Sequence, residues 1–189
     1  QLGQRVHAAN LIAQNYRHIV LATGITPRIP AIEGVQNAKV VGYLDVLRDK
    51  CAVGKTVAII GAGGIGFDVA EYLLHQKAVD FYDEWGVDTN AAKNATRGGL
   101  KPSQIPPAPR KVYLLQRKAS KVGDGLGKTT GWIHRTSLKN RGVEMISGVD
   151  YRRIDDDGLH ITVGEKNTTL PVDTIVLCAG QTPQRELQA

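Results

Sequence analysis

The sequence is poor in cysteine: its 189 residues include only Cys51 and Cys178, far apart along the chain. This excludes an iron–sulfur cluster, a zinc site and a CxxC redox pair, and we expect both to be inert, buried thiols. No apolar run approaches the roughly 20 residues of a membrane span. The N-terminus also lacks the basic, apolar and small-residue regions of a signal peptide. These absences predict a cytoplasmic protein with no membrane partner.

Methionine occurs once, at Met145, and the chain begins with Gln1. An unprocessed translation product would begin with methionine. We therefore expect that the chain has been cut or that its beginning is missing.

The composition is that of a folded domain, with 42% apolar and 22% charged residues. Disorder, collagen and disulfide-scaffold classes are thereby excluded. The formal net charge of +6 could indicate a polyanion partner, but Lys and Arg are spread along the whole chain. The densest basic group, residues 110–121, surrounds an apolar strand. This pattern favours a small anionic ligand over nucleic acid.

The strongest pattern is residues 55–76, KTVAIIGAGGIGFDVAEYLLHQ. Val57 to Ile60 predict a buried strand, glycines follow at once, and Ile65, Val69 and Leu73 recur at helical spacing. A strand, a glycine turn and a helix open a βαβ unit. Its second strand is predicted at 111–117, after a proline-containing surface insertion at 77–110.

Further elements complete an α/β fold. A glycine-rich loop at 123–127 precedes a predicted helix at 130–140 and a short strand at 143–146. The DDDG turn predicts a hairpin of strands 151–154 and 159–163, which a third strand near 168–170 extends. A last strand is predicted at 174–179. We predict a Rossmann-like parallel sheet with a three-stranded antiparallel meander.

The N-terminal part is predicted to contain a buried strand within 16–24, YRHIVLATG, followed by an extended proline-containing loop without regular hydrogen bonding. Residues 39–48 then predict a short strand and a helical turn. The ATGITP that ends the first strand is closely echoed by AGQTP at the end of the last.

Residues 61–66 satisfy the spacing G-x-G-x-x-G. Gly61 permits the tight turn, Gly63 lets the backbone approach a pyrophosphate, and Gly66 lets the helix pack on the sheet. The N–H groups at the start of the helix would bind the anion. Between a strand and an amphipathic helix, this spacing favours dinucleotide binding over an ordinary flexible loop.

The end of the second strand predicts which dinucleotide binds. An acidic residue there would select NAD, but the sequence reads Gln116, Arg117 and Lys118, with Lys121 following. Cations at this place suit the 2′-phosphate of NADP, with a solvated basic turn as the alternative.

Other candidate motifs do not hold. GLGKTTG at 125–131 lacks the earlier glycine of a P-loop, because Val122 stands at that position. DDDG lacks the alternation and distal glutamate of a calcium loop. The histidines show no metal-ligand spacing, so we predict no metal site and no covalent catalyst.

Taken together, these segments resemble flavoproteins in which an NAD(P)H domain is inserted into an FAD domain. The stretches LLQRKASK, GLGKTTGWIHRTSLKNRGV and IDDDGLH are similar to the C-terminal part of bacterial NADPH-dependent 2,4-dienoyl-CoA reductases. The likeness covers nearly the whole chain. It implies a relay in which NADPH reduces FAD, a 4Fe-4S cluster passes electrons to FMN, and FMN in a TIM barrel reduces the substrate.

The resemblance also implies a domain division and an incomplete enzyme. Residues 1–50 would be a partial FAD-domain segment, 51–179 the NADPH-binding domain, and 180–189 the return towards the FAD domain. FAD, FMN and 4Fe-4S are expected only in the full-length enzyme, because the barrel and the rest of the FAD domain are absent from the sequence. By itself, this piece should bind NADPH and reduce nothing.

The resemblance adds three groups to the candidate site. Ala22, Thr23 and Gly24 would lie at the flavin-side crossover, and Ala179 and Gly180 at the corresponding return. Asp68 stands where related proteins carry an acid near the nicotinamide carboxamide, or is simply a solvated helix residue. The full set of predicted cofactor-binding residues is Gly61, Ala62, Gly63, Gly64, Ile65, Gly66, Asp68, Gln116, Arg117, Lys118, Lys121, Ala179, Gly180, Ala22, Thr23 and Gly24.

Two alternatives remain open at the level of the sequence. A flavoprotein of the trimethylamine-dehydrogenase type could keep a similar domain that holds an adenine nucleotide only structurally. A basic chain could also be a polyanion-binding module.

Overall fold

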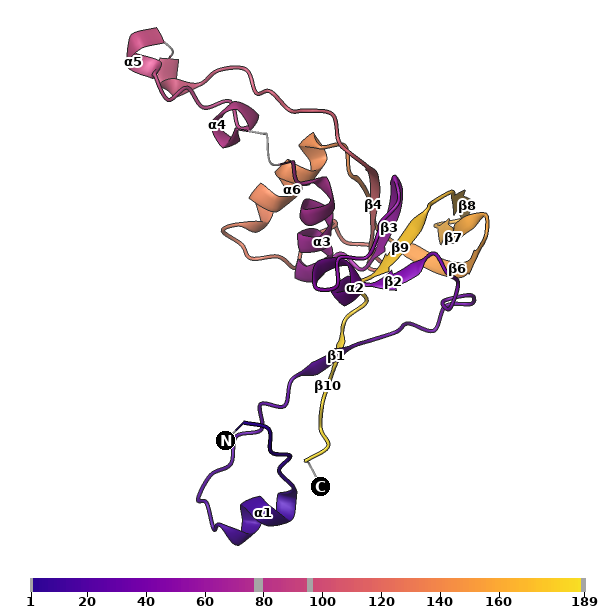
Figure 1. The fold of residues 1–189 in the computed structure, drawn as a ribbon. Coiled ribbons are helices and arrows are strands. Elements are labelled where there is room, and N and C mark those ends of the chain that lie inside the picture. The colour runs from indigo at the N-terminus through magenta and orange to yellow at the C-terminus, as the bar shows by residue number, and fades with distance from the viewer. Residues whose placement is uncertain (1, 77–79, 95–96, 188–189) are drawn as a thin grey trace. The chain divides into compact units, whose positions relative to one another are not determined.

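The structure is a computed structural model that describes residues 2–76, 80–94 and 97–187. It contains two compact units, one made of Gln1–Arg28 and Gly180–Ala189 and the other of Ile29–Ala179 (Figure 1). The predictions for positions 77–79 and 95–96 of the insertion and for the last two positions of the return segment lie outside the described residues.

The larger unit is built on a five-stranded parallel sheet with the order β2-β9-β3-β4-β5. Its strands are β2 (Val40–Gly42), β3 (Thr56–Ile60), β4 (Lys111–Leu115), β5 (Glu144–Ile146) and β9 (Thr174–Leu177). The first strand of the glycine pattern, β3, is central, since β9 and β4 pair with its two edges. The predicted α/β class with a parallel sheet is confirmed.

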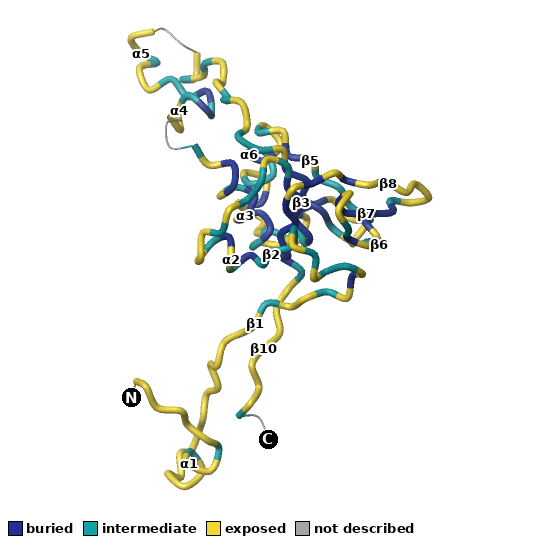
Figure 2. Tube along the Cα trace, turned by 45° about the vertical axis from the view of Figure 1, so that its right-hand side comes forward, coloured by how far each residue is buried: buried dark blue, intermediate teal, exposed yellow. Residues whose placement is uncertain are grey.

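The two faces of the sheet bury different partners. Along β3, Val57 and Ile59 face a cluster that contains side chains of the helices α2 (Tyr43–Leu47), α3 (Gly64–Leu74) and α6 (Gly131–Asn140). Ala58 and Ile60 face a second cluster, which the meander completes. This alternation follows from the period of two along a strand. Figure 2 shows the buried residues concentrated at this layered centre.

The meander consists of β6 (Val149–Asp155), β7 (Gly158–Val163) and β8 (Lys166–Leu170), paired antiparallel in that order. The predicted DDDG turn joins β6 to β7, and the backbone N–H of Asp157 donates to Asp155 Oδ1 at 3.0 Å. Gly158 has a φ of 133°. A Cβ there would lie 2.1 Å from the Leu170 carbonyl oxygen, so the turn requires glycine. The hairpin and its third strand are confirmed.

The loop before β2 departs from prediction. It was expected to lack regular hydrogen bonding, yet Glu33 forms a parallel bridge with Arg153, and the Ile154 N–H donates to the Glu33 carbonyl at 2.8 Å. Gly34 fits tightly there, since a Cβ would lie 1.9 Å from the Ile154 carbonyl oxygen. The loop therefore packs on the meander. The following strand and helical turn, β2 and α2, match the prediction for 39–48.

The smaller unit contains α1 (Ala8–Ala13) and a two-stranded ribbon of β1 (Ile25–Pro27) and β10 (Gln181–Pro183). The two echoing segments are thus antiparallel partners, with Thr26 opposite Thr182. The predicted buried strand within 16–24 is wrong, because these described residues form neither helix nor strand. Val20 is 88% exposed. The apolar pattern of residues 16–24 is typical of a strand, but in the described part of the smaller unit no sheet covers these residues.

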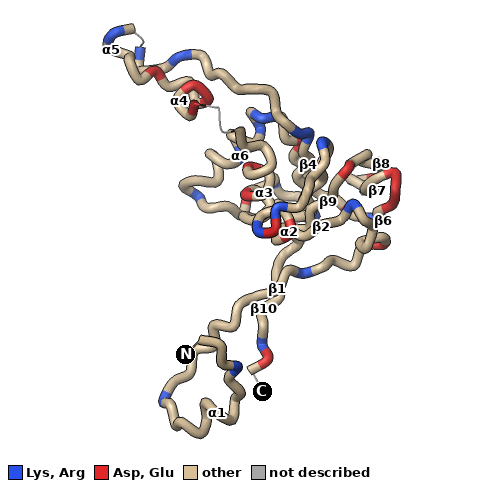
Figure 3. The backbone as a smooth tube through the Cα atoms, viewed as in Figure 1, with Lys and Arg blue, Asp and Glu red and all other residues tan. Residues whose placement is uncertain are grey.

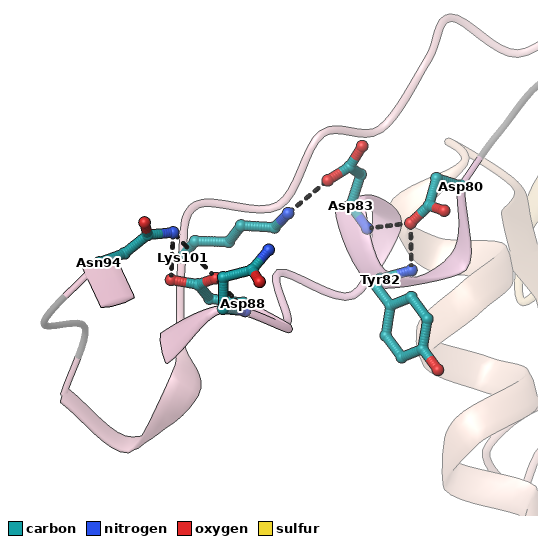
Figure 4. Close-up of polar contacts among 7 residues, drawn as sticks. Asp80, Tyr82, Asp83, Asp88, Asn94 and Lys101 are labelled. Carbon is teal, nitrogen blue, oxygen red and sulfur yellow. Dashed lines mark hydrogen bonds and ion pairs between the residues drawn. The ribbon is translucent and has the colours of Figure 1, made fainter. Parts of the chain in front are cut away.

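The insertion between α3 and β4 has local structure of its own: α4 (Phe81–Glu84), α5 (Ala91–Asn94) and the 3₁₀ turn η1 (Arg97–Gly99). Asp80 caps α4 by accepting hydrogen bonds from the Tyr82 and Asp83 backbone N–H groups (Figure 4). Lys101 forms an ion pair with Asp83. These contacts order the segment locally, because each one joins residues close in sequence or across a single loop.

Candidate nucleotide-binding site

The glycine turn after β3 is closely packed at two of its positions. Gly61 has a φ of 113°, and a Cβ there would lie 2.2 Å from the Cys178 carbonyl oxygen. At Gly66 a Cβ would lie 1.9 Å from the Gly61 carbonyl oxygen. Both glycines are required by the fold itself, in the roles that the spacing predicted: the tight turn and the close helix contact.

Gly63 differs from both, because no described atom beyond its chain neighbours lies within 4 Å of the position a Cβ would take. The same holds for Gly64 once the backbone of its own helix is set aside. Gly63 also has an ordinary φ of −83°. Neither local packing nor backbone strain therefore requires glycine there. The open surface above the turn fits a ligand that approaches the backbone.

The start of α3 offers donors to such a ligand. The first N–H groups of a helix have no partner within the helix, and no side chain in the described part of the chain caps α3. Ala62 and Ile65 pack against the helix-side core and hold the turn in place. The backbone N–H groups of 64–66 can therefore bind an anion such as a pyrophosphate, aided by the helix dipole.

The basic turn after β4 is organised by Gln116. Its Nε2 donates to the carbonyl oxygens of Lys118 at 3.0 Å and Ser120 at 2.8 Å. The backbone joins in, since the Gly148 N–H donates to the Lys118 carbonyl. Arg117, Lys118 and Lys121 are exposed on this turn. Gln116 thus shapes the turn that presents the three cations.

Cys178 follows β9 and lies against Gly61 of the glycine turn, and Asp68 of α3 lies near its thiol. Burial, with the nearby Asp68 carboxylate as a further cause, raises the pKa of the Cys178 thiol to about 12. Cys178 is therefore a buried thiol, as predicted. Cys51 is only half-buried, and burial raises its thiol pKa as well. Ala179 follows Cys178 and packs against the meander-side core.

The remaining predicted residues belong to the smaller unit. Thr23 Oγ1 donates to the Gln184 carbonyl oxygen at 2.6 Å, and the Gln184 N–H donates to the Gly24 carbonyl at 3.0 Å. Gly180 accepts a hydrogen bond from the Arg28 N–H. Ala22, Thr23, Gly24 and Gly180 therefore belong to the smaller unit, whereas the other predicted site residues belong to the larger unit.

The sequence reading overlooked the exposed side of α6. Trp132, Arg135 and Lys139 line a groove together with Lys121. The spacing i, i+3, i+7 from position 132 indicates that these three residues share one face of the helix. The pattern combines an aromatic residue with cations, so it does not resemble the apolar stripe of a core helix.

Within residues 2–76, 80–94 and 97–187, no cluster of three or more His, Cys, Asp or Glu side chains could hold a metal ion. In the same ranges, no helix is long and apolar enough to cross a membrane. Lys and Arg are distributed over many elements rather than gathered on one (Figure 3).

Curated relatives share modest identity with the chain. A "Metal reductase" of Desulforamulus reducens is 29% identical over 175 residues, which are 91% of this chain and 25% of that protein. A protein of Castellaniella defragrans named "Probable ferredoxin reductase CtmF" is 26% identical, over 98% of this chain and 39% of its own length. The chain therefore spans well under half the length of these relatives.

Solved structures share the fold. A 2-naphthoyl-CoA reductase superposes with a TM-score of 0.68 at 22% identity, covering 99% of this chain and 24% of that chain. A 6-hydroxypseudooxynicotine amine oxidase from Pseudomonas geniculata gives 0.67 at 16% identity, covering 98% and 25%.

The family model described as pyridine nucleotide-disulphide oxidoreductase matches residues 3–189, nearly the whole chain. Its match agrees with the glycine turn, the parallel sheet and the meander described above. The chain therefore belongs to the pyridine nucleotide-disulphide oxidoreductase family and carries a pyridine nucleotide-binding oxidoreductase domain.

Proposed function

We propose that this chain binds NADPH and positions it for hydride transfer to FAD in a larger flavin and iron–sulfur reductase of the 2,4-dienoyl-CoA type. The observation that carries the nucleotide site is the open surface above Gly63, beside two glycines that the fold packs tightly. The uncapped N–H groups at the start of α3 supply the donors that a pyrophosphate needs, and the open surface at Gly63 supplies the space.

The residues of the larger unit divide the nucleotide between them. The N–H groups of 64–66 bind the pyrophosphate. Arg117, Lys118 and Lys121 bind the 2′-phosphate, because charge-assisted hydrogen bonds favour a phosphate monoester over a free hydroxyl. Asp68, on α3, and Ala179, just after β9, would lie towards the nicotinamide end. In this proposal the NADPH-binding domain is the expected 51–179 together with residues 29–50, because β2 pairs with β9 in the same sheet.

Bound NADPH would supply the hydride chemistry, and the protein contributes position and electrostatics. Ala22, Thr23, Gly24 and Gly180 would form the flavin side. Of the expected FAD-domain segments 1–50 and 180–189, residues 29–50 belong to the larger unit. We therefore assign residues 1–28 and 180–189 to the FAD domain. The chain has a single G-x-G-x-x-G and two distant cysteines, so its residues do not fit a whole FAD site or a 4Fe-4S cluster. We assign FAD, FMN, the cluster and the TIM barrel to further parts of the same polypeptide.

The substrate class rests on likeness. GLGKTTGWIHRTSLKNRGV is similar to the dienoyl-CoA reductases, and one of the solved structures that share the fold is a CoA-thioester reductase by its name. The metal reductase and the ferredoxin reductase among the relatives are oxidoreductases with other printed activities. Reduction of an unsaturated acyl-CoA is the function we favour among these.

One titration series tests the proposal against its alternatives. The chain is titrated calorimetrically with NADPH, NADH, ADP and duplex DNA at fixed, moderate ionic strength. Tightest binding of NADPH supports the proposal. Equal binding of ADP and NADPH supports a structural adenine-nucleotide domain, and DNA binding with a steep salt dependence supports a polyanion module.

A further inference from the structure

We propose that residues 80–94 and 97–104 of the insertion, called the arm below, bind the arm of a second copy of this chain and so form a dimer. Three features of the arm support this partner: it is ordered without a core, it exposes aromatic side chains, and its two ends carry opposite charge. The inference is independent of the proposed nucleotide function, because none of the predicted cofactor-binding residues lies in the arm.

The arm is ordered by backbone pairing. Val87 forms an antiparallel bridge with Leu100, and beside it the Lys101 N–H donates to the Gly86 carbonyl oxygen at 2.9 Å. Gly86 has a φ of 65°, and a Cβ there would lie 2.4 Å from the Lys101 carbonyl oxygen. The segments on either side of α5 are therefore held together in one local fold.

The arm buries little of its own surface. Of its residues, only Glu84 and Gly86 are buried. The Glu84 carboxylate is buried in an ion pair with Arg141 of the core, so even this contact is polar. A segment this small buries too little apolar surface to be stable by itself, and it gains stability from a partner.

Aromatic side chains gather at α4. The ring of Phe81 lies 5.8 Å from that of Tyr82 and 6.3 Å from that of Trp85, between centroids. Phe81 is nevertheless 63% exposed and Tyr82 49%, and Leu100, which directly follows η1, is 68% exposed. In Figure 4 the Tyr82 ring points away from the polar contacts of the arm. Exposed aromatic clusters of this kind are typical of protein–protein interfaces.

The two ends of the arm carry opposite charge (Figure 3). Asp80 and Asp83 lie at α4, where Lys101 forms an ion pair with Asp83. Lys93 lies in α5 and Arg97 in η1, and both are exposed. Within the ranges that the structure describes, neither Lys93 nor Arg97 forms an ion pair with an acid. The α4 end is therefore acidic, and the end formed by α5 and η1 is basic.

Asp88 lies between the two ends and serves the local fold. Its carboxylate accepts hydrogen bonds from the Asn90 N–H at 2.8 Å and from the Asn94 side-chain amide at 3.1 and 3.2 Å (Figure 4). These bonds fix the turn that leads into α5. Asp88 therefore orients the basic end relative to the paired segments.

A second copy of the arm matches this pattern. In a twofold dimer the same patch is used on both copies, so each contact occurs twice. Two antiparallel arms would place the acidic end of each opposite the basic end of the other, whereas parallel arms would bring like charges together. The antiparallel arrangement also brings Phe81 and Tyr82 of one copy towards Leu100 of the other. Charge thus selects the orientation, and the apolar contacts supply the affinity.

Sedimentation equilibrium of the chain tests the aromatic part of the interface. At micromolar concentrations the chain should be a dimer. Phe81→Ala and Tyr82→Ala should each raise the dissociation constant at least about tenfold, because a side chain in a twofold interface is lost twice. Tyr72→Ala is the matched control, since Tyr72 is 43% exposed on α3, outside the arm, and should leave the dimer unchanged. Circular dichroism checks that each variant is folded.

Exchange of charge tests the antiparallel pairing. One variant carries Lys93→Glu with Arg97→Glu. The other carries Asp83→Lys with Asp80→Asn, in which the asparagine keeps a capping oxygen for α4. Each variant alone should be monomeric where the wild type is a dimer. A mixture of the two should form mixed dimers, because each variant keeps the end that the other needs and the two altered ends also attract each other.

The outcomes decide the inference. A chain that stays monomeric up to about 1 mM overturns it, since the arm would then face a different protein or a further part of the same polypeptide. A dimer that survives the arm variants uses another surface, such as the exposed apolar residues of the smaller unit, and also overturns it. The same holds if the mixed variants stay monomeric. Lys55→Glu with Lys166→Glu changes charge equally elsewhere, and an equal loss of dimer in that control would overturn the pairing.

Discussion

Arg141 and Glu84 form a bidentate ion pair that ties the insertion to the layered core. Arg141 Nε and Nη2 donate to the two Glu84 carboxylate oxygens at 3.0 and 2.8 Å, and the two side chains are only 12% and 10% exposed. Arg141 Nη1 also donates to the Leu74 carbonyl oxygen at 2.8 Å, at the end of α3. One guanidinium thus joins α4 of the insertion, the end of α3 and the end of α6.

Glu84→Ala should therefore lower the free energy of unfolding by about 3 kcal/mol, because it leaves a largely buried guanidinium without its counter-ion. The insertion should also become sensitive to protease, since α4 loses its anchor. Urea denaturation and limited proteolysis check both effects. The matched control is Glu144→Ala, which breaks an exposed pair with Lys111 and should change stability little. Equal losses in the two variants would contradict the anchoring role.

Two glycines of the turn should respond in opposite ways. Gly63→Val should leave the fold intact, because the space around its Cβ is open, but should abolish NADPH binding by filling the place of the pyrophosphate. Gly66→Ala should instead destabilise the fold by about 2 kcal/mol, since its Cβ would meet the Gly61 carbonyl. Thermal unfolding and calorimetry distinguish the two. Wild-type NADPH affinity in a folded Gly63→Val variant would refute the site.

Arg117→Ala should weaken NADPH by about tenfold to a hundredfold, from the loss of one charge-assisted contact. NADH should be nearly unaffected, because it lacks the 2′-phosphate. Both affinities are measured at fixed ionic strength. Lys166→Ala removes a positive charge elsewhere and serves as the control for a general loss of field. If Arg117→Ala lowered the affinities for NADPH and NADH equally, the proposed contact between Arg117 and the 2′-phosphate would be refuted.

The meander should be weakened by acid through Asp155. The hydrogen bond between Asp155 and His160, at 2.8 Å, is the main cause that holds the pKa of this carboxyl below its ordinary value of 3.8. A carboxyl whose pKa is lower in the folded state stabilises the fold above its unfolded pKa. That contribution is lost as the pH falls through the folded pKa. Stability should therefore decline below about pH 4 partly through this group.

Asp155→Asn removes this titration and checks it. Denaturant midpoints measured from pH 6 to pH 2.5 should fall less steeply with acid in Asp155→Asn than in the wild type. The neighbouring Asp157→Asn provides the control, because the Asp157 backbone rather than its side chain contacts Asp155. An unchanged slope in Asp155→Asn would assign the acid sensitivity to other carboxyls.

The sequence by itself was sufficient for the elements whose signals are local. The apolar run 57–60, the glycine spacing 61–66 and the period of helix α3 each lie within one short window, and together they determined a βαβ opening. The DDDG turn likewise determined the hairpin of β6 and β7. The position of Arg117 and Lys118 could be predicted for the same reason, because they directly follow the predicted strand and so lie at its carboxyl end.

Tertiary structure decided everything that depends on which distant segments meet. The apolar residues of 16–24 read as a buried strand, but burial requires a covering sheet, and the described part of their unit provides none. Glu84 and Arg141 are 57 positions apart, so no local pattern could pair them. Trp132 and Lys121 share a groove only because α6 packs beside β5. Hydrophobic periodicity reports which side of an element is buried, whereas its partner is set by the packing of the whole chain.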